Sequence, residues 1–129
     1  MCMIYDADGS VVMLGQDKRK ARKSHRCSEC RRSIQPGEEY MDERFIWQGE
    51  INQHRTCRHC LVVRDWLLAE CGGYLYGYVY EDIREHVHEG AYGVDVKFLS
   101  IGMERRWQRR DGRVWPTPRT PKTTHEATA

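Results

Sequence analysis

The alternation of apolar and polar residues between Glu39 and Arg55 is typical of an antiparallel β-hairpin. Glu39 to Trp47 predicts one strand, Gln48-Gly49-Glu50 a turn, and Ile51 to Arg55 the returning strand. Pro36-Gly37 marks a further turn just before the first strand. The sequence therefore predicts a hairpin that begins at a turn.

The spacing becomes helical after the hairpin. Apolar residues between Cys57 and Glu70 lie on more than one stripe, which predicts a helix that is covered on both sides. Thr56 is placed to cap its first turn, and Gly72-Gly73 to end it.

Two further helices are predicted in the C-terminal half. A short acidic helix runs from Tyr80 to Glu89 and ends at Gly90. Asp95 can cap another helix from Val96 to about Arg110. The apolar side of this last helix is formed by Val96, Leu99, Met103 and Trp107.

The two ends of the chain have weaker patterns. Residues 1–14 hold two short apolar runs around Asp8-Gly9, so they predict either a small hairpin or a loosely attached arm. Residues 114–129 are rich in proline and threonine, which predicts a tail that is disordered or ordered only by packing.

The cysteines change this picture, because four of them form two Cys-x-x-Cys pairs on either side of the hairpin. A Cys-x-x-Cys turn directs two thiolates to one point, and a structural zinc ion takes four such ligands in a tetrahedron. We therefore expect one structural Zn²⁺, with His25, His54 and His59 as surface or supporting residues. The predicted ligands are Cys27, Cys30, Cys57 and Cys60.

Disulfides or merely buried thiols are the alternatives for these four cysteines. Disulfides need an oxidising compartment. Residues 1–15 have no basic segment followed by a long apolar one, so they do not resemble a signal peptide. This favours zinc and a cytoplasmic location. Cys2 is then expected to be an exposed thiol without a partner, and Cys71 a small buried residue.

The composition is that of a small domain with a modest core. Hydrophobic residues are 40% and charged residues 31% of the 129 residues. Zinc binding, on the order of 10 kcal/mol for structural sites, would supply part of the folding energy. No apolar run approaches the roughly 20 residues of a membrane span.

Together the elements and the cysteines predict a small α+β fold. Its parts are an N-terminal hairpin or arm (1–16), a zinc-binding core of knuckle, hairpin and helix (17–73), a helical extension packed on that core (74–113) and the tail (114–129).

Charge is unevenly distributed although the net charge is only +2. Residues 17–32 hold eight basic and two acidic groups (+6), residues 64–104 three and eight (−5), and residues 105–129 seven and two (+5). The basic ends could contact nucleic-acid phosphates or an acidic partner, or simply be solvated. The candidates are Lys18, Arg19, Lys20, Arg22, Lys23, Arg105, Arg106, Arg109 and Arg110.

Tyrosines alternate with smaller residues in the segment 74–80. A period of two would put all four on one face of a strand, where they would form either a contact surface or a packed cover over the zinc core. We favour the packed cover. The tyrosines are Tyr74, Tyr76, Tyr78 and Tyr80.

Two resemblances follow from these motifs. The order of knuckle, hairpin and helix resembles a treble clef zinc finger. The most similar part is the run from Cys27 through Ile34, Gly37, Glu38 and Tyr40. When further motifs are included, residues 1–113 look like a group of small bacteriophage and prophage proteins, mostly of unassigned function. These further motifs are Ala21-Arg22-Lys23, Thr56-Cys57-x-x-Cys60, Leu67-Leu68 and Cys71-Gly72-Gly73. The resemblance implies a phage origin and a zinc fold, and proteins of this class often bind host proteins, including defence systems such as CRISPR complexes.

Enzyme activity has little support in the sequence. Some treble clef proteins are nucleases of the His-Asn-His type, and this hairpin offers Asp42, Glu43, Asn52 and His54, but it has no Asp-His pair. Phosphate-binding glycine loops and Ser-His-Asp arrangements are also missing from the sequence. We therefore expect a non-enzymatic protein that binds a host protein in the host cytoplasm, with DNA or RNA binding as the alternative and no small-molecule substrate.

Overall fold

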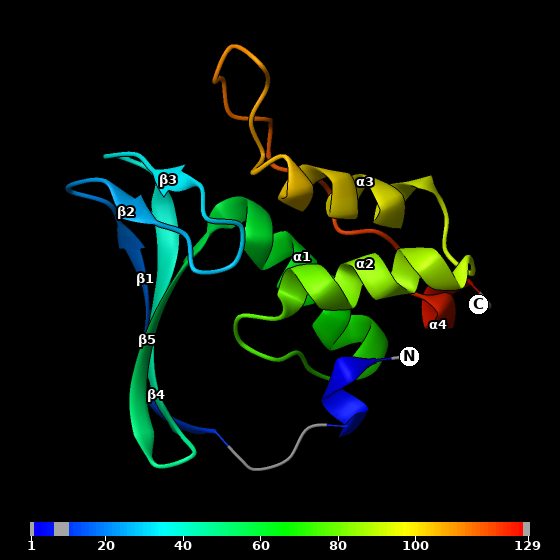
Figure 1. Cartoon of the computed structure of the whole chain (residues 1–129), viewed down its shortest axis with the longest axis horizontal. Coiled ribbons are helices and arrows are strands. Elements are labelled where there is room, and N and C mark those ends of the chain that lie inside the picture. The colour runs from blue at the N-terminus through cyan, green and yellow to red at the C-terminus, as the bar shows by residue number, and fades with distance from the viewer. Residues whose placement is uncertain (1, 7–10, 128–129) are drawn as a thin grey trace.

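The computed structural model describes residues 2–6 and 11–127 and has an α+β fold. A three-stranded antiparallel sheet and a small two-stranded sheet lie beside a group of helices (Figure 1). In chain order the elements are η1 (Met3–Asp6), β1 (Val12–Lys20), β2 (His25–Arg26), β3 (Ser33–Ile34), β4 (Glu39–Trp47), β5 (Glu50–Cys57), α1 (Arg58–Cys71), α2 (Val79–Glu89), α3 (Val94–Glu104) and α4 (Thr124–Ala127).

The hairpin predicted from the alternating pattern is confirmed as β4 and β5. Its register runs from Trp47 opposite Glu50 to Tyr40 opposite Cys57. Gln48 and Gly49 form the turn, both with the positive φ angles that tight hairpin turns require. The pairing brings Cys57 to the end of the hairpin that lies next to Pro36-Gly37.

The third strand, β1, begins in the second apolar run of the N-terminal hairpin considered for residues 1–14, but it extends to Lys20 and has a different partner. β1 pairs antiparallel with β4 and forms an edge of the sheet, so the order is β1-β4-β5. The basic residues 18–20, which are among the candidates for binding nucleic acid or an acidic partner, thus lie in this strand. Residues 3–5 form a 3₁₀ helix instead of a strand, and the Asp8-Gly9 turn lies outside the described residues.

The helical part packs around α1. Buried apolar side chains of α1, α2 and α3 form one core together with the cysteines, Ile34 on β3 and Trp107 after α3. A fully buried apolar side chain contributes about 1.5–3 kcal/mol. Members from the three helices include Val63, Trp66, Leu67, Ile83 and Leu99.

α1 and α2 begin and end close to the predicted residues. Two details of the prediction are wrong: the cap of α1 and the strand expected before α2. Gly72 and Gly90 end α1 and α2 in the left-handed conformation, as expected. The N-cap of α1 is Cys57 rather than Thr56, whose hydroxyl instead accepts a hydrogen bond from Arg64. Residues 74–78 form no strand; they are a loop that leads into α2.

The last predicted helix is shorter than expected. α3 begins after Gly93 rather than after an Asp95 cap, and it ends at Glu104. Arg106 and Trp107 have φ angles of 55°, which turn the chain back along the helix. The fully buried Trp107 ring then lies against Gly102, where a side-chain methyl group would collide with it.

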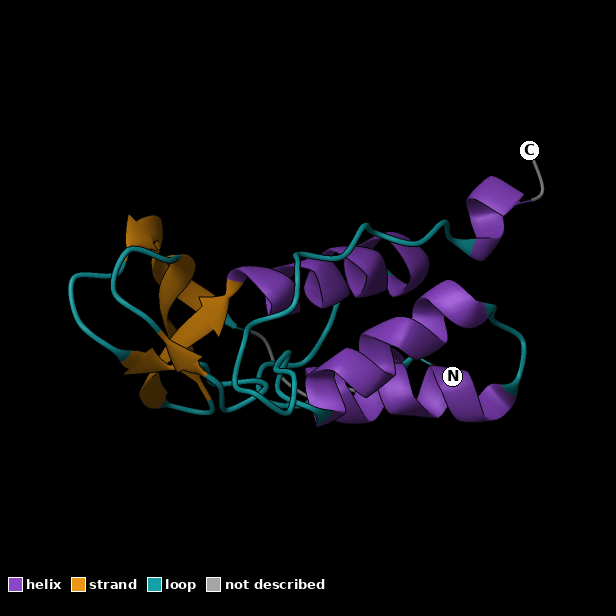
Figure 2. Ribbon diagram, turned by 90° about the horizontal axis from the view of Figure 1, so that it is seen from above, coloured by secondary structure: helices purple, strands orange, loops and turns teal. Residues whose placement is uncertain are grey.

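The C-terminal segment runs back over the helices, as the ribbon in Figure 2 shows. The Trp66 indole N–H points to the Lys122 carbonyl at 3.4 Å, and the Thr124 backbone N–H donates to the Glu70 carboxylate. Residues 114–127 are therefore ordered by packing. Within the described ranges, no helix is long and apolar enough to cross a membrane.

Candidate metal centre

The first cysteine pair lies in the turn between β2 and β3. The Cys27 N–H donates to the Arg32 carbonyl and the Arg31 N–H donates to the Cys27 carbonyl, so the backbone closes on itself between the two cysteines. Arg31 has a φ angle of 69°, the left-handed conformation that completes the turn. This geometry places Cys27 and Cys30 on the same side of the loop.

The second pair lies where a strand becomes a helix. Cys57 ends β5 and caps α1, and Cys60 follows in the first turn of α1. The Ser28 N–H donates to the Arg55 carbonyl at 2.7 Å, and the Arg55 N–H donates to the Ser28 hydroxyl at 3.1 Å. These two bonds hold the knuckle turn against the end of the hairpin.

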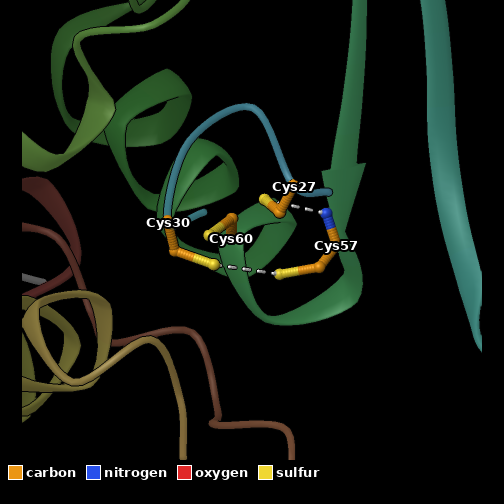
Figure 3. A group of neighbouring side chains, drawn as sticks. All are labelled: Cys27, Cys30, Cys57 and Cys60. Atoms are coloured by element: carbon orange, nitrogen blue, oxygen red, sulfur yellow. Dashed lines mark hydrogen bonds between the residues drawn. The ribbon is translucent and has the colours of Figure 1, made fainter. Parts of the chain in front are cut away.

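The four sulfurs converge in one buried group (Figure 3). All lie within 4.8 Å of one another, and the Cys30 and Cys57 sulfurs are 3.8 Å apart. A tetrahedral zinc ion with sulfur ligands at about 2.3 Å separates its sulfurs by about 3.8 Å. The four cysteines thus have the number, spacing and burial of a structural metal site, and Zn²⁺ is the ion that best suits them.

The thiols perturb one another strongly. Hydrogen bonds from Cys27, Cys30 and Cys60 hold the pKa of Cys57 well below its usual range. Burial, reinforced by the neighbouring thiols, raises the pKa of Cys60 well above it. Four buried thiolates need a compensating cation, which a divalent metal ion would supply.

Glu38 lies outside the four-cysteine group and connects the segments that carry its two cysteine pairs. Its carboxylate accepts hydrogen bonds from Arg32, Arg58 and the backbone N–H of Gln35, at 2.6–3.1 Å. Arg32 lies beside the first cysteine pair and Arg58 beside the second. Glu38 therefore links the two halves of the site, and Gly37 (φ 93°) turns the chain so that it can do so.

The three nearby histidines are not part of the cysteine group. His59 lies between the guanidinium of Arg32, 3.4 Å from Nδ1, and the carbonyl of Trp115, which Nε2 contacts. His54 packs against Phe45 and Tyr76, and its Nδ1 is 3.9 Å from the Glu29 carboxylate. His25 packs against Tyr40. Each supports the surrounding structure, in agreement with the prediction.

A buried polar network that the sequence did not reveal joins the sheet to α1. The Arg64 guanidinium donates to both Glu43 carboxylate oxygens, at 2.6 and 2.9 Å, and to Thr56. Although burial opposes it, the bond from Arg64 lowers the pKa of Glu43. Glu43, one of the acidic residues considered for a nuclease site, is therefore engaged by an arginine.

Two of the four tyrosines belong to this network. The Tyr76 hydroxyl donates to Glu43 at 2.7 Å, and the Tyr74 hydroxyl contacts Arg64, whose guanidinium lies 4.5 Å above the Tyr74 ring. Tyr80 is half-buried and Tyr78 is 48% exposed. Because residues 74–78 form a loop, the four tyrosines do not line one face of a strand, although Tyr74, Tyr76 and Tyr78 border the same hollow. Tyr74 and Tyr76 serve packing.

The predicted basic residues are all exposed. Arg19 pairs with Asp17 and Asp42, each at 3.4 Å. Among the described residues, the other eight have no carboxylate within ion-pair distance. Figure 1 places the end of β1 and the loop after α3 on the same side of the molecule, the upper side of that view.

Of the two remaining cysteines, Cys71 is buried as predicted, but the prediction for Cys2 is wrong. Cys2 is buried rather than exposed, and it forms a disulfide with Cys71 across 69 residues.

No family model, no curated protein and no solved structure matches the chain. What the cysteine groups can bind therefore follows from their own geometry.

Proposed function

We propose that this chain is a phage-encoded treble clef zinc protein that binds a host protein and has no catalytic activity of its own. In this proposal Zn²⁺ is structural: it fixes the knuckle turn to the hairpin and to α1, and an adjoining surface meets the partner. The resemblance to small phage proteins supports a target in the host cytoplasm, with a defence complex of the CRISPR class as one candidate.

The observation that carries the proposal is an apolar surface on the sheet. Val12, Ile46 and Ile51 are cross-strand neighbours, so they form one row on one face of all three strands. Val12 is 54% and Ile51 66% exposed. Exposed apolar residues on an edge strand invite pairing with another chain unless the edge is protected.

Further exposed apolar residues lie at the same edge of the sheet but do not belong to this row. Val11, just before β1, and Met13 alternate with Val12 and face the other side of the sheet, while Leu14 lies at the register shift that follows Met13; each is 42–50% exposed. Beside them lies a hollow of about 340 Å³, lined by apolar and aromatic residues that include Ile4, Trp47 and Tyr78. A protein partner that adds a strand to β1 and places apolar side chains in the hollow fits these features.

Nucleic-acid binding is a second candidate, and it is supported by a different observation. Eight of the nine predicted basic residues are exposed without a carboxylate partner among the described residues, and both basic segments lie on the upper side of Figure 1. Each phosphate contact would release a condensed counterion, so such binding would weaken steeply with salt. Binding at an apolar row would depend much less on salt.

Affinity capture from a bacterial lysate, with and without nuclease, tests the two candidates against each other. One variant carries Val12→Thr and Ile51→Thr, which keep β-branched side chains on the exposed row. The matched variant carries Lys18→Gln, Arg19→Gln, Lys20→Gln, Arg22→Gln and Lys23→Gln. Both sets of positions are exposed, so both variants should melt like the wild type.

The proposal expects a protein that survives nuclease and moderate salt, and that is lost with the threonine variant but kept with the glutamine variant. Purified partner and wild-type chain should then bind directly. Capture that disappears with nuclease and with the glutamine variant would instead establish the nucleic-acid function and overturn the proposed one.

A further inference from the structure

A second group of metal-ligating side chains lies at the other end of α1. Cys71 is the last residue of α1, Cys2 precedes η1, and His86 is on α2. Cys60 is in the first turn of the same helix, so the two groups are separated by about 16 Å along its axis. All three side chains are buried, with 7, 6 and 1% of Cys2, Cys71 and His86 exposed.

The imidazole of His86 is oriented as in a metal site. Its Nδ1 lies 2.8 Å from the Asp82 carbonyl and 3.3 Å from the Asp82 carboxylate, so this nitrogen carries the proton. Nε2 therefore presents its lone pair to the two sulfurs. A carboxylate or carbonyl behind a histidine is the usual support for a metal-binding imidazole.

The distances around Nε2 fit a tetrahedral ion. Nε2 is 3.6 Å from the Cys2 sulfur and 3.4 Å from the Cys71 sulfur. Zinc bonds of about 2.3 Å to sulfur and 2.0–2.1 Å to nitrogen give a separation of about 3.6 Å. The sulfurs themselves must part from bonding distance to about 3.8 Å to share one ion.

The sulfurs of Cys2 and Cys71 can move apart only when their disulfide is reduced, and the four-cysteine group described above also requires reducing conditions. Cys27, Cys30, Cys57 and Cys60 bind a metal ion only as thiolates, which persist in a reducing compartment. The same compartment favours reduction of the Cys2–Cys71 disulfide. Reduction would leave two buried thiols facing a correctly oriented imidazole.

We propose that Cys2, Cys71 and His86 form a second metal site, which binds Zn²⁺ or another thiophilic divalent cation when the Cys2–Cys71 disulfide is reduced. A thiol reductant supplies two electrons and two protons, the S–S bond breaks, and the reductant becomes a disulfide. The cation then displaces the two thiol protons and accepts the Nε2 lone pair.

Three protein ligands leave a fourth position for a water molecule. Within the described part of the chain, no further Cys, His, Asp or Glu joins the group. The rings of Trp66 and Tyr92 lie 5.2 and 5.3 Å from the His86 ring and enclose it. The cation would tie the N-terminal segment to α1 and α2 in place of the disulfide.

Metal stoichiometry of the full-length chain tests this proposal, with Zn²⁺ as the probe and Co²⁺ as its spectroscopic substitute. Protein reduced with a phosphine should bind two ions per chain, and oxidised protein one. Cys2→Ala and His86→Gln should each bind one ion under reducing conditions. His88→Gln, an exposed position on the same helix, should still bind two.

The two sites fail in distinguishable ways. Cobalt bound to four thiolates and cobalt bound to two thiolates and an imidazole differ in their absorption bands, so the loss of either site can be assigned. One ion per reduced wild-type chain, or two ions in both Cys2→Ala and oxidised wild-type protein, would overturn the second site. If His86→Gln does not fold, Cys2→Ala alone decides the outcome.

Discussion

At the scale of single residues, Glu38 shows how the candidate metal centre is held. One carboxylate accepts from Arg32, Arg58 and the Gln35 backbone, and these three groups come from both sides of the cysteine group. Charge-assisted bonds of this kind are about twice as strong as neutral ones. In the folded chain these bonds hold the two cysteine pairs in position around the candidate metal centre.

Cys30→Ser should abolish cooperative folding, because three remaining thiolates cannot complete a closed tetrahedral site. The lost metal binding is on the order of 10 kcal/mol, comparable with the whole stability of a small domain. Zinc content and thermal melting measure the effect, with exposed Ser24→Ala as control. A cooperative, near-wild-type melt of Cys30→Ser would sink the structural zinc hypothesis.

The zinc ligands could be predicted from the sequence because their chemistry is local. A Cys-x-x-Cys pair fixes its own geometry, and the alternating pattern of residues 39–55 brings the two pairs together. The Cys2–Cys71 pair could not be predicted in this way. Its members are 69 residues apart, and only the packing of the N-terminal segment against the end of α1 brings them together.

At the scale of elements, the joint between the sheet and the helices depends on one buried ion pair. Arg64 on α1 and Glu43 on β4 are almost fully buried, and their polar groups are satisfied largely by each other and by Tyr74, Tyr76 and Thr56. Removing one partner from such a pair leaves an uncompensated charge in the interior.

Glu43→Gln should therefore lower the free energy of unfolding by about 3 kcal/mol, measured by denaturant titration of the zinc-loaded protein near pH 7. Glu39→Gln, at an exposed position of the same strand, should change it by less than about 0.5 kcal/mol. Equal effects of the two variants would show that the pair does not hold the joint.

The same pair makes stability depend on pH. The pKa of Glu43 is below its ordinary value of 4.5, so the folded state favours the ionised form. This stabilisation is fully present above about pH 4.5 and is lost as the pH falls through the folded pKa. The difference in unfolding free energy between wild type and Glu43→Gln should accordingly shrink below pH 4.5, relative to the Glu39→Gln control.

The extent of the elements was predictable only where one pattern dominated. Residues 39–55 and 80–89 have clear periodicities, and the structure has the predicted hairpin and helix there. The pattern predicts a longer helix than α3, because Trp107 continues the spacing of Leu99 and Met103. Its ring is indeed buried, but through a reversal of the chain at Arg106, and Gly102 was the only local sign that a ring would lie against the helix.

At the scale of the whole molecule, Trp107 connects three parts of the fold. Its ring lies 5.3 Å from that of His59 on α1 and 5.9 Å from that of Trp115 in the C-terminal segment, and it covers Gly102 on α3. His59 in turn adjoins Arg32 and the cysteine group. The tail, α3 and the metal centre are thus continuous in packing.

Trp107→Ala should lower the free energy of unfolding by about 3 kcal/mol, because it leaves a cavity among these three parts. Denaturant unfolding measures this loss, and Val94→Ala, at a position of α3 that is 81% exposed, is the control. An unchanged melt of Trp107→Ala would mean that α3 and the tail are detached from the core.

The register of the hairpin has a consequence for how this chain can change in length. Cys57 reaches the knuckle turn because it lies opposite Tyr40 and points to the correct face of the sheet. One residue inserted within β5 would turn Cys57 to the other face. Insertions and deletions should therefore be tolerated as matched pairs beside Gln48-Gly49, where each added cross-strand pair lengthens the hairpin without moving the ligand.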